Sequence, residues 1–78
     1  MRVEVQIMLK NGVLDPQAKA ITQALHTMGF DTLTEIKMGK SIFLEFSEND
    51  TQEIRAKVER MCEELLANTV IEDYVIKL

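Results

Sequence analysis

Only a handful of side chains in this sequence have the chemistry of a nucleophile or a base. Cys62 is the single cysteine, and it lies on an apolar stripe with Val58 and Leu65, where free cysteine behaves as a small hydrophobe. His26, the single histidine, falls in the last turn of a predicted helix, where positive charge interacts favourably with the helix dipole. We therefore predict a buried structural thiol and a helix-terminal histidine, and no nucleophile–base pair.

Two pairs of adjacent carboxylates are the next candidates for acid–base chemistry. Glu63 and Glu64 fall on the solvated face of a predicted helix, whereas a catalytic acid needs a desolvated pocket to shift its pKa. Glu72 and Asp73 begin a predicted strand, which sends successive side chains to opposite faces. Neither pair is expected to work as a catalytic dyad.

A phosphate site before the first helix is the last chemical possibility. Asn11 and Gly12 precede a helix N-terminus, a place where anions bind, but Asp15 occupies the cap and would repel an anion there. The lysines that could meet a phosphate or an acidic partner are separated along the chain, as solubilising lysines are: Lys10, Lys37 and Lys40. We predict no catalytic, cofactor-binding or metal-binding residue.

Size, charge and composition exclude several classes of protein. The net charge of −4, with 9 basic residues scattered over 78, provides no basic stripe for nucleic acid. No apolar run approaches the roughly 20 residues that span a bilayer, residues 1–4 lack the pattern of a signal peptide, and one unpaired cysteine fits a reducing compartment. We expect a cytoplasmic protein that binds neither nucleic acid nor membrane.

So short a chain has little stability to spare. It buries only roughly 60% of the surface that its unfolded state exposes, and one cysteine without a metal-ligand cluster provides no staple. Self-association, as a dimer or a tetramer, is the remaining common device and is expected here.

The first half of the chain has the pattern of a strand followed by a helix. Residues 2–10 alternate apolar and polar side chains, which predicts a half-buried strand. Asp15 and Pro16 have the residue types of an N-cap and a first helical position. Gly29 and Phe30 fit a Schellman ending, with Phe30 packed back on Leu25. The apolar residues between them have helical spacing: Leu14, Ala18, Ile21, Leu25 and Met28.

The second half predicts a hairpin, a helix and a last strand. Residues 32–46 alternate as two strands around a turn at Gly39-Lys40, and Asp50 with Glu53 resembles a capping box. Asn68 is expected to end the second helix in a left-handed conformation, and residues 70–78 form the final strand. One helical face is apolar: Ile54, Val58, Met61, Cys62 and Leu65.

Together these elements predict a single α+β domain over residues 1–78. Its order, β-α-β-β-α-β, is that of the ferredoxin-like two-layer sandwich, an antiparallel sheet with both helices on one face. We expect Leu25 and Leu65 to pack on a buried sheet face formed by Val5, Ile7, Ile42 and Leu44. The other face carries Met8, Phe43 and Val75 among charged residues, and we expect it to mediate self-association.

Four segments in order and spacing give the chain a resemblance to a known family. They are Val-Leu-Asp-Pro-Gln at 13–17, Ala-Leu-His at 24–26, Gly-Lys at 39–40 and Met-Cys-Glu-Glu-Leu-Leu-Ala-Asn-Thr-Val-Ile-Glu-Asp-Tyr at 61–74. This pattern resembles the PurS family, small accessory subunits of phosphoribosylformylglycinamidine (FGAM) synthase. Position 18 departs from this pattern, because the small residue expected there is often glycine and this chain has Ala18.

The resemblance implies a non-catalytic assembly subunit of an ATP-dependent ligase in purine biosynthesis. Its implied partners are the synthetase PurL, which uses ATP and Mg²⁺, and the glutaminase PurQ, whose ammonia must reach the amidating site for formylglycinamide ribonucleotide to become FGAM. The loops that carry the resemblance are the expected partner interface: Lys10, Asn11, Gly12, Asp15, Asn68, Thr69, Glu72, Asp73 and Tyr74. The alternative is a stand-alone regulatory module of the ACT type, which would bind a small metabolite at a dimer interface.

Overall fold

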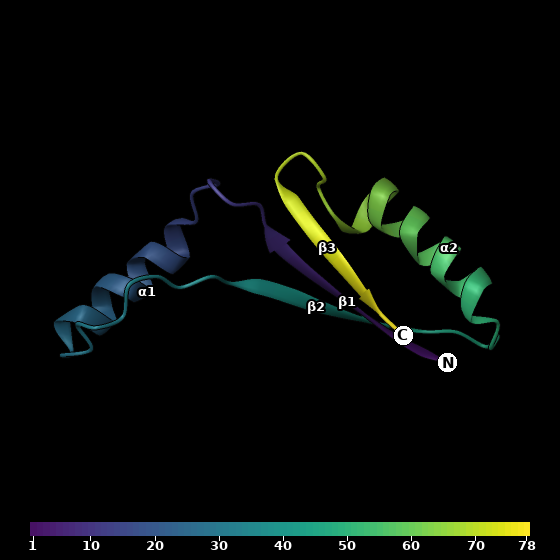
Figure 1. The fold of residues 1–78 in the computed structure, drawn as a ribbon, viewed down its shortest axis with the longest axis horizontal. Helices are drawn as coiled ribbons and strands as arrows, with labels where there is room; N and C mark the ends of the chain where they lie inside the picture. The colour runs from purple at the N-terminus through teal and green to yellow at the C-terminus, as the bar shows by residue number, and fades with distance from the viewer.

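The computed structural model describes residues 1–78 as a small α+β fold with two α-helices and a three-stranded sheet. Figure 1 shows the elements in chain order. They are β1 (Arg2–Leu9), α1 (Pro16–Thr27), β2 (Gly39–Glu45), α2 (Thr51–Met61), a π-helical turn η1 (Cys62–Leu66) and β3 (Glu72–Lys77).

The sheet is antiparallel throughout, with β1 between β2 and β3. The inward side chains of β1, Val3, Val5 and Ile7, are almost fully buried, as the alternating pattern predicts. Ile54 and Val58 of α2 close the same core from the helix layer. The whole buried cluster is Val3, Val5, Ile7, Ile54, Val58, Cys62 and Ala67.

The ends of α1 are set by local sequence, and both predictions are confirmed. Asp15 is the N-cap, and its carboxylate accepts the backbone N–H of Gln17 at 3.0 Å. At the other end, Gly29 has φ of 101°, its N–H donates to the His26 carbonyl at 3.1 Å, and the N–H of Phe30 donates to the Leu25 carbonyl at 3.0 Å. These are the two bonds of a Schellman motif.

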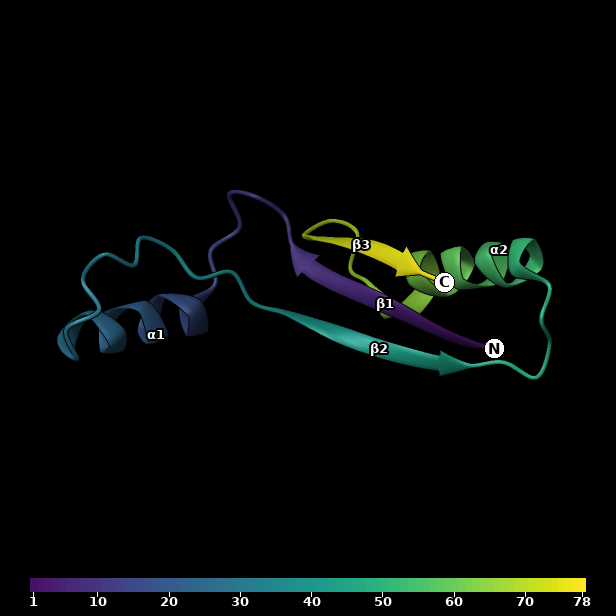
Figure 2. The ribbon, with the colours of Figure 1, turned by 60° about the horizontal axis from the view of Figure 1, so that its bottom comes forward.

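The position of α1 differs from the prediction. Only α2 covers the sheet, whereas α1 lies beyond the end of β1, far from α2, in both ribbon views (Figures 1 and 2). The molecule is accordingly elongated, 49 × 24 × 14 Å. Leu25 is half-buried and lies outside the buried cluster. The ferredoxin-like layer of two helices on one face is therefore not formed within this single chain.

The predicted hairpin over residues 32–46 is also wrong. Residues 33–38 form no strand, and Gly39 lies within the sheet, opposite Met8, instead of at a turn. A Cβ on Gly39 would collide with the Met8 sulfur and lie 2.5 Å from the Ile7 carbonyl oxygen. Gly39 is thus explained by the close approach of two strands. In the sequence, a glycine with this role has the same pattern as a glycine in a turn.

A π-helical turn changes which leucine packs on the core. The N–H of Ala67 donates to the carbonyl of Cys62, five residues earlier, at 3.0 Å, so one extra residue is accommodated. Leu66 consequently packs against the core, while Leu65 is 83% exposed. The prediction that Leu65 lies on the buried face is wrong because it assumed uninterrupted α-helical spacing.

The connection from β2 to α2 is held by charged side chains. Asp50 caps α2, accepting the N–H of Gln52 and Glu53 at 3.1 and 3.2 Å. Lys57 lies 2.6 Å from Glu48 and 3.5 Å from Glu53, and its hydrogen bond to Glu48 raises the pKa of Lys57. The Glu53 side chain thus contacts Lys57.

None of the helices combines the length and the apolar character needed to cross a membrane.

Candidate functional site

The two loops predicted to contact partners lie side by side at one end of the sheet. The Lys10 ammonium is 3.4 Å from the Asp73 carboxylate, and the Lys10 N–H donates to the Ile71 carbonyl at 2.8 Å. The register continues this contact, since Leu9 pairs with Glu72 and Met8 with Asp73. Residues more than 60 positions apart in sequence therefore share one surface. We call Lys10, Asn11, Gly12, Asn68, Thr69, Glu72 and Asp73 the loop surface.

Hydrogen bonds around Asn68 give the second of these loops its shape. The Asn68 side-chain oxygen accepts the N–H of Val70 at 3.2 Å, and the Asn68 backbone carbonyl accepts the N–H of Glu72 at 2.7 Å. The Glu72 carboxylate in turn accepts the Asn68 N–H at 2.7 Å. No non-glycine residue has positive φ, so Asn68 is not the left-handed terminator that was predicted. It shapes the turn through its side chain.

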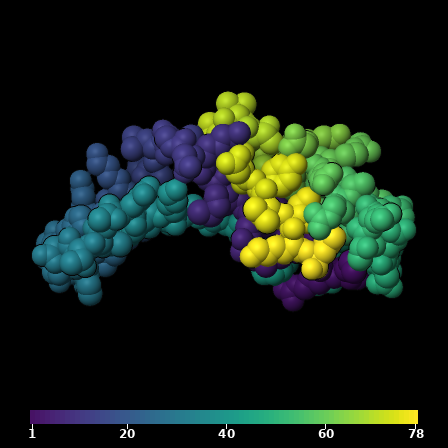
Figure 3. All heavy atoms as spheres, viewed as in Figure 1, coloured from purple at the N-terminus to yellow at the C-terminus, as the bar shows by residue number.

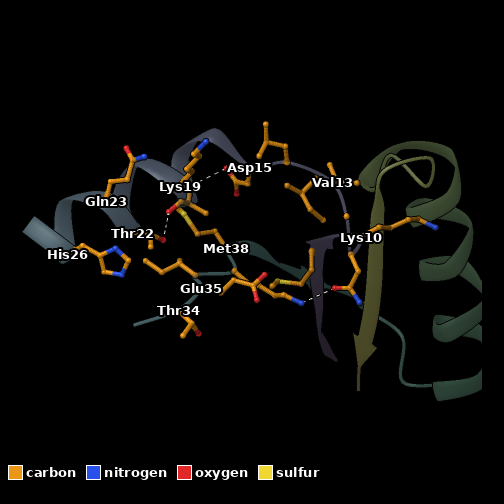
Figure 4. A pocket seen from close by; sticks show the side chains of 18 residues that line it. Lys10, Val13, Asp15, Lys19, Thr22, Gln23, His26, Thr34, Glu35 and Met38 are labelled. Carbon is orange, nitrogen blue, oxygen red and sulfur yellow. Dashed lines mark hydrogen bonds between the residues drawn. The ribbon is translucent and has the colours of Figure 1, made fainter. Parts of the chain in front are cut away.

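The first loop borders a cleft between β1, α1 and residues 34–38 (Figure 4). The cleft has a volume of about 430 Å³. Gly12 has φ of 86° where the chain turns into it, and Asn11 accepts a hydrogen bond from the Lys37 ammonium at 2.8 Å. Asp15, also on its wall, is engaged as the cap of α1. Lys10 and Lys37 already have oxygen partners, which disfavours a phosphate site here.

Tyr74 lies apart from the other predicted partner residues. Its side chain lies on the helix side of β3, where it is half-buried against the core. Interaction with the Glu63 carboxylate raises the pKa of Tyr74, and burial raises the pKa of the Cys62 thiol. Cys62 is fully buried, which confirms its predicted structural place.

The open face of the sheet carries the three residues predicted for self-association. Met8, Phe43 and Val75 are 38%, 52% and 56% exposed, and the register places them on one face. Glu4 and Gln6 lie between Phe43 and Val75. The surface is therefore mixed, with apolar side chains separated by polar ones.

Sequence reasoning missed three contacts of this region. The Arg2 guanidinium lies 4.4 Å from the centre of the Phe43 ring, the Lys37 ammonium reaches Asn11, 26 positions away, and the His26 ring nitrogen bonds the Leu33 carbonyl at 2.6 Å. The last of these ties residue 33 to α1, a local role for His26 besides its place in the last turn. A pairing between distant positions leaves no periodic signal, so only the fold could reveal the first two.

The fold and the loop surface define a small α+β protein whose polar loops gather at one end of a three-stranded sheet. No group of three or more histidine, cysteine, aspartate or glutamate side chains is placed to hold a metal ion.

Comparison with known proteins identifies the family. The model of the PurS family, phosphoribosylformylglycinamidine (FGAM) synthase, matches residues 2–78. The PurS subunit of Bacillus subtilis is 44% identical over 73 residues, covering 94% of this chain and 86% of that protein, and the PurS subunit of Methanocaldococcus jannaschii is 39% identical, covering 99% and 93%. The chain belongs to the PurS family of FGAM synthase subunits. This membership disfavours the ACT-type alternative.

Solved structures give the same relationship. Bacillus subtilis PurS matches with a TM-score of 0.86 at 42% identity, covering 97% of this chain and 94% of that chain. A chain of the PurLQS structure from Thermotoga maritima matches with a TM-score of 0.86 at 28% identity, covering 97% and 93%. The extended arrangement of α1 is therefore compatible with the fold of experimentally determined relatives.

Proposed function

We propose that this chain is the assembly subunit of an FGAM synthase, acting with a PurL synthetase and a PurQ glutaminase. The observation that carries the proposal is the full-length match to the PurS family together with the match to a chain of the PurLQS complex. The chain contributes no catalytic group in this proposal. ATP and Mg²⁺ are bound by the PurL subunit.

The purpose of such a subunit follows from the reaction. Ammonia released from glutamine must reach the site where formylglycinamide ribonucleotide is amidated before it escapes to water. A small subunit that fixes the relative position of the two larger ones supports this transfer. In this proposal the synthesis takes place in the cytoplasm. Residues 1–78 act in it as one PurS-like domain.

The loop surface is the proposed contact with these partners. Its convergence from two distant segments supports this assignment, because Lys10 and Asp73 then form part of one continuous surface. Asp15 and Tyr74 contribute to this surface indirectly. Asp15 caps α1, and Tyr74 packs against the core on the helix side of β3. A small polar surface of this kind sets orientation more than it sets affinity.

Self-association is the second element of the proposal. Met8, Phe43 and Val75 on the open sheet face are the proposed contact, because they are the large exposed apolar side chains of a sheet face that neither helix covers. We also propose that the ferredoxin-like βαββαβ arrangement belongs to the assembled state of the protein.

Reconstitution with PurL and PurQ tests the assembly role. Glutamine-dependent formation of FGAM should require this chain, whereas ammonia-dependent formation by PurL alone should require it far less, since free ammonia bypasses the transfer. The chain alone should show no ligase, glutaminase or ATPase activity. Equal glutamine-dependent turnover with and without the chain would overturn the proposal.

A further inference from the structure

The connection between α2 and β3 carries the two most exposed large apolar side chains in the protein. Leu65 in η1 is 83% exposed and Val70 in the following turn is 82% exposed. Leu66 and Ala67, which lie between them, pack on the core instead. The connection forms the upper edge of the body in Figure 3, where it is light green to yellow-green. We call Leu65 and Val70 the apolar pair.

A single partner can cover both members of the apolar pair. The five-residue step between them spans at most about 18 Å, whereas one side of a standard interface covers ~800 Å², or roughly 30 Å across. Two backbone hydrogen bonds of 3.0 Å hold this stretch in place. The N–H of Ala67 donates to the Cys62 carbonyl, and the N–H of Ile71 donates to the Asn68 carbonyl. A surface that is already ordered loses little conformational freedom on binding.

The charge around the apolar pair has one predominant sign. Residues 59–73 contain five carboxylates and a single base, Arg60, so this segment alone has a formal net charge of −4. The whole chain has the same net charge, −4, so all the other residues together are neutral. Arg60 is itself paired with the Glu64 carboxylate at 3.3 Å. The apolar pair therefore lies within an acidic segment, whose carboxylates are those of Glu59, Glu63, Glu64, Glu72 and Asp73.

This charge disfavours a second copy of the chain as the occupant. In a two-fold contact the same patch meets itself, which would bring two acidic segments together, and like charges across an interface are costly. The rest of the chain holds 8 of the 9 bases and 8 of the 13 carboxylates. It therefore offers no excess of positive charge for another kind of contact between copies. The pattern fits a different protein, one with basic side chains around an apolar recess.

We propose that the apolar pair inserts into an apolar recess of one of the two larger synthase subunits, and that lysine and arginine side chains of that subunit surround the recess. An apolar centre with a polar rim is the usual anatomy of a protein interface. Asn68 and Thr69 of the loop surface lie between Leu65 and Val70 in the sequence, so the contact is continuous with the loop surface. The inference rests on the assembly role in the proposed function. It adds the side chains that provide affinity and the chemistry of the surface that receives them.

Titration of the chain into a mixture of PurL and PurQ tests the apolar pair. Glutamine-dependent synthesis is measured against chain concentration, which separates the half-saturating concentration from the maximal rate. Leu65→Ala and Val70→Ala should each raise the half-saturating concentration about tenfold and leave the maximal rate unchanged, because an anchor of the interface is lost. Leu65→Met keeps an apolar side chain and should retain the original value. Gln52→Ala, exposed on α2, is the surface control and should also retain it.

A matched pair of charge changes tests the basic character of the partner. Glu64→Gln removes one negative charge from the acidic segment, and Gln52→Lys makes the same change of net charge outside it. Glu64→Gln should raise the half-saturating concentration about threefold, since a complementary charge is lost from the rim. Gln52→Lys should leave it unchanged. An unchanged or lower half-saturating concentration with Glu64→Gln would overturn the basic-rimmed recess.

Light scattering at micromolar concentration distinguishes the larger subunit from a second copy as the occupant. Leu65→Ala and Val70→Ala should leave the mass of the isolated chain unchanged, and a fall in mass would overturn the proposal. If synthesis requires the chain but both variants titrate like the unaltered protein, the docking of the apolar pair is wrong and the assembly role stands. Synthesis that proceeds equally well without the chain would overturn the assembly role, and the docking with it.

Discussion

The Lys10 ammonium lies 3.4 Å from the Asp73 carboxylate, and this ion pair joins the exit of the first strand to the entry of the last. Both side chains are well exposed, 42% and 70%. An exposed ion pair contributes only about 0–1 kcal/mol to stability. We therefore expect Lys10 and Asp73 to act through the proposed partner surface more than through folding.

Charge reversal at Lys10 should separate recognition from stability. Lys10→Glu places like charges beside Asp73 and should reduce glutamine-dependent turnover of the reconstituted complex by roughly tenfold, about 1.4 kcal/mol. The urea midpoint of the isolated chain should change little. Arg55→Glu, on the exposed side of α2, is the control and should leave turnover unchanged. Equal losses in the two variants would argue against the loop surface.

Truncations in α2 and in the π turn should distinguish the observed core from the one predicted by spacing. Ile54→Ala removes a fully buried side chain and should lower the free energy of unfolding by about 2–5 kcal/mol. Leu65→Ala should cost no more than about 0.5 kcal/mol, the range of surface substitutions. Urea denaturation of both variants measures the difference, and a larger loss for Leu65→Ala would show that the π turn is absent in solution.

Introducing a charge at Phe43 tests the open face of the sheet. Phe43→Asp would bury an unpaired carboxylate in the proposed contact and remove the ring that Arg2 covers, so it should lower the assembly to a smaller species in light scattering. Gln52→Asp, exposed on α2, should leave the mass unchanged. An unchanged mass for Phe43→Asp would exclude this face from self-association.

Alkaline pH should destabilise the protein through Cys62 and Tyr74. Both pKa values are raised in the folded state, from ordinary values of 9.0 and 10.0. The folded state therefore binds protons more tightly than the unfolded state. Stability is then retained below the ordinary values and falls as pH rises through them toward the folded-state values. Denaturation from pH 8 upward checks this, and Cys62→Ala should remove the part of the fall that begins near the ordinary thiol value.

The features that sequence predicts correctly are those decided within a few residues. Asp15 and Gly29 set the ends of α1 because a cap bond and a left-handed glycine depend on local backbone geometry. The burial pattern of β1 follows from alternation alone. In the candidate site, the two loops could be named from sequence, but their meeting through Lys10 and Asp73 depends on β1 pairing with β3.

The failures share a physical cause, which is that one local pattern fits two long-range arrangements. A glycine between two alternating runs fits a turn or a close strand contact, and at Gly39 the contact with Met8 decides. An amphipathic helix such as α1 fits any apolar surface, whether on its own chain or on another. Helical spacing also cannot reveal the extra residue that moves Leu65 outward.

The π turn at Cys62–Leu66 gives the chain a site where its length can vary. The hydrogen bond from Ala67 reaches back five residues to Cys62, so the turn holds one residue more than the four-residue step of an α-helix. Deleting Glu64, an exposed residue inside the turn, would allow ordinary helical bonding and still deliver the chain to β3. The same deletion inside α2 would rotate Val58 or Ile54 out of the core, so length changes during evolution should accumulate in the turn and spare the helix.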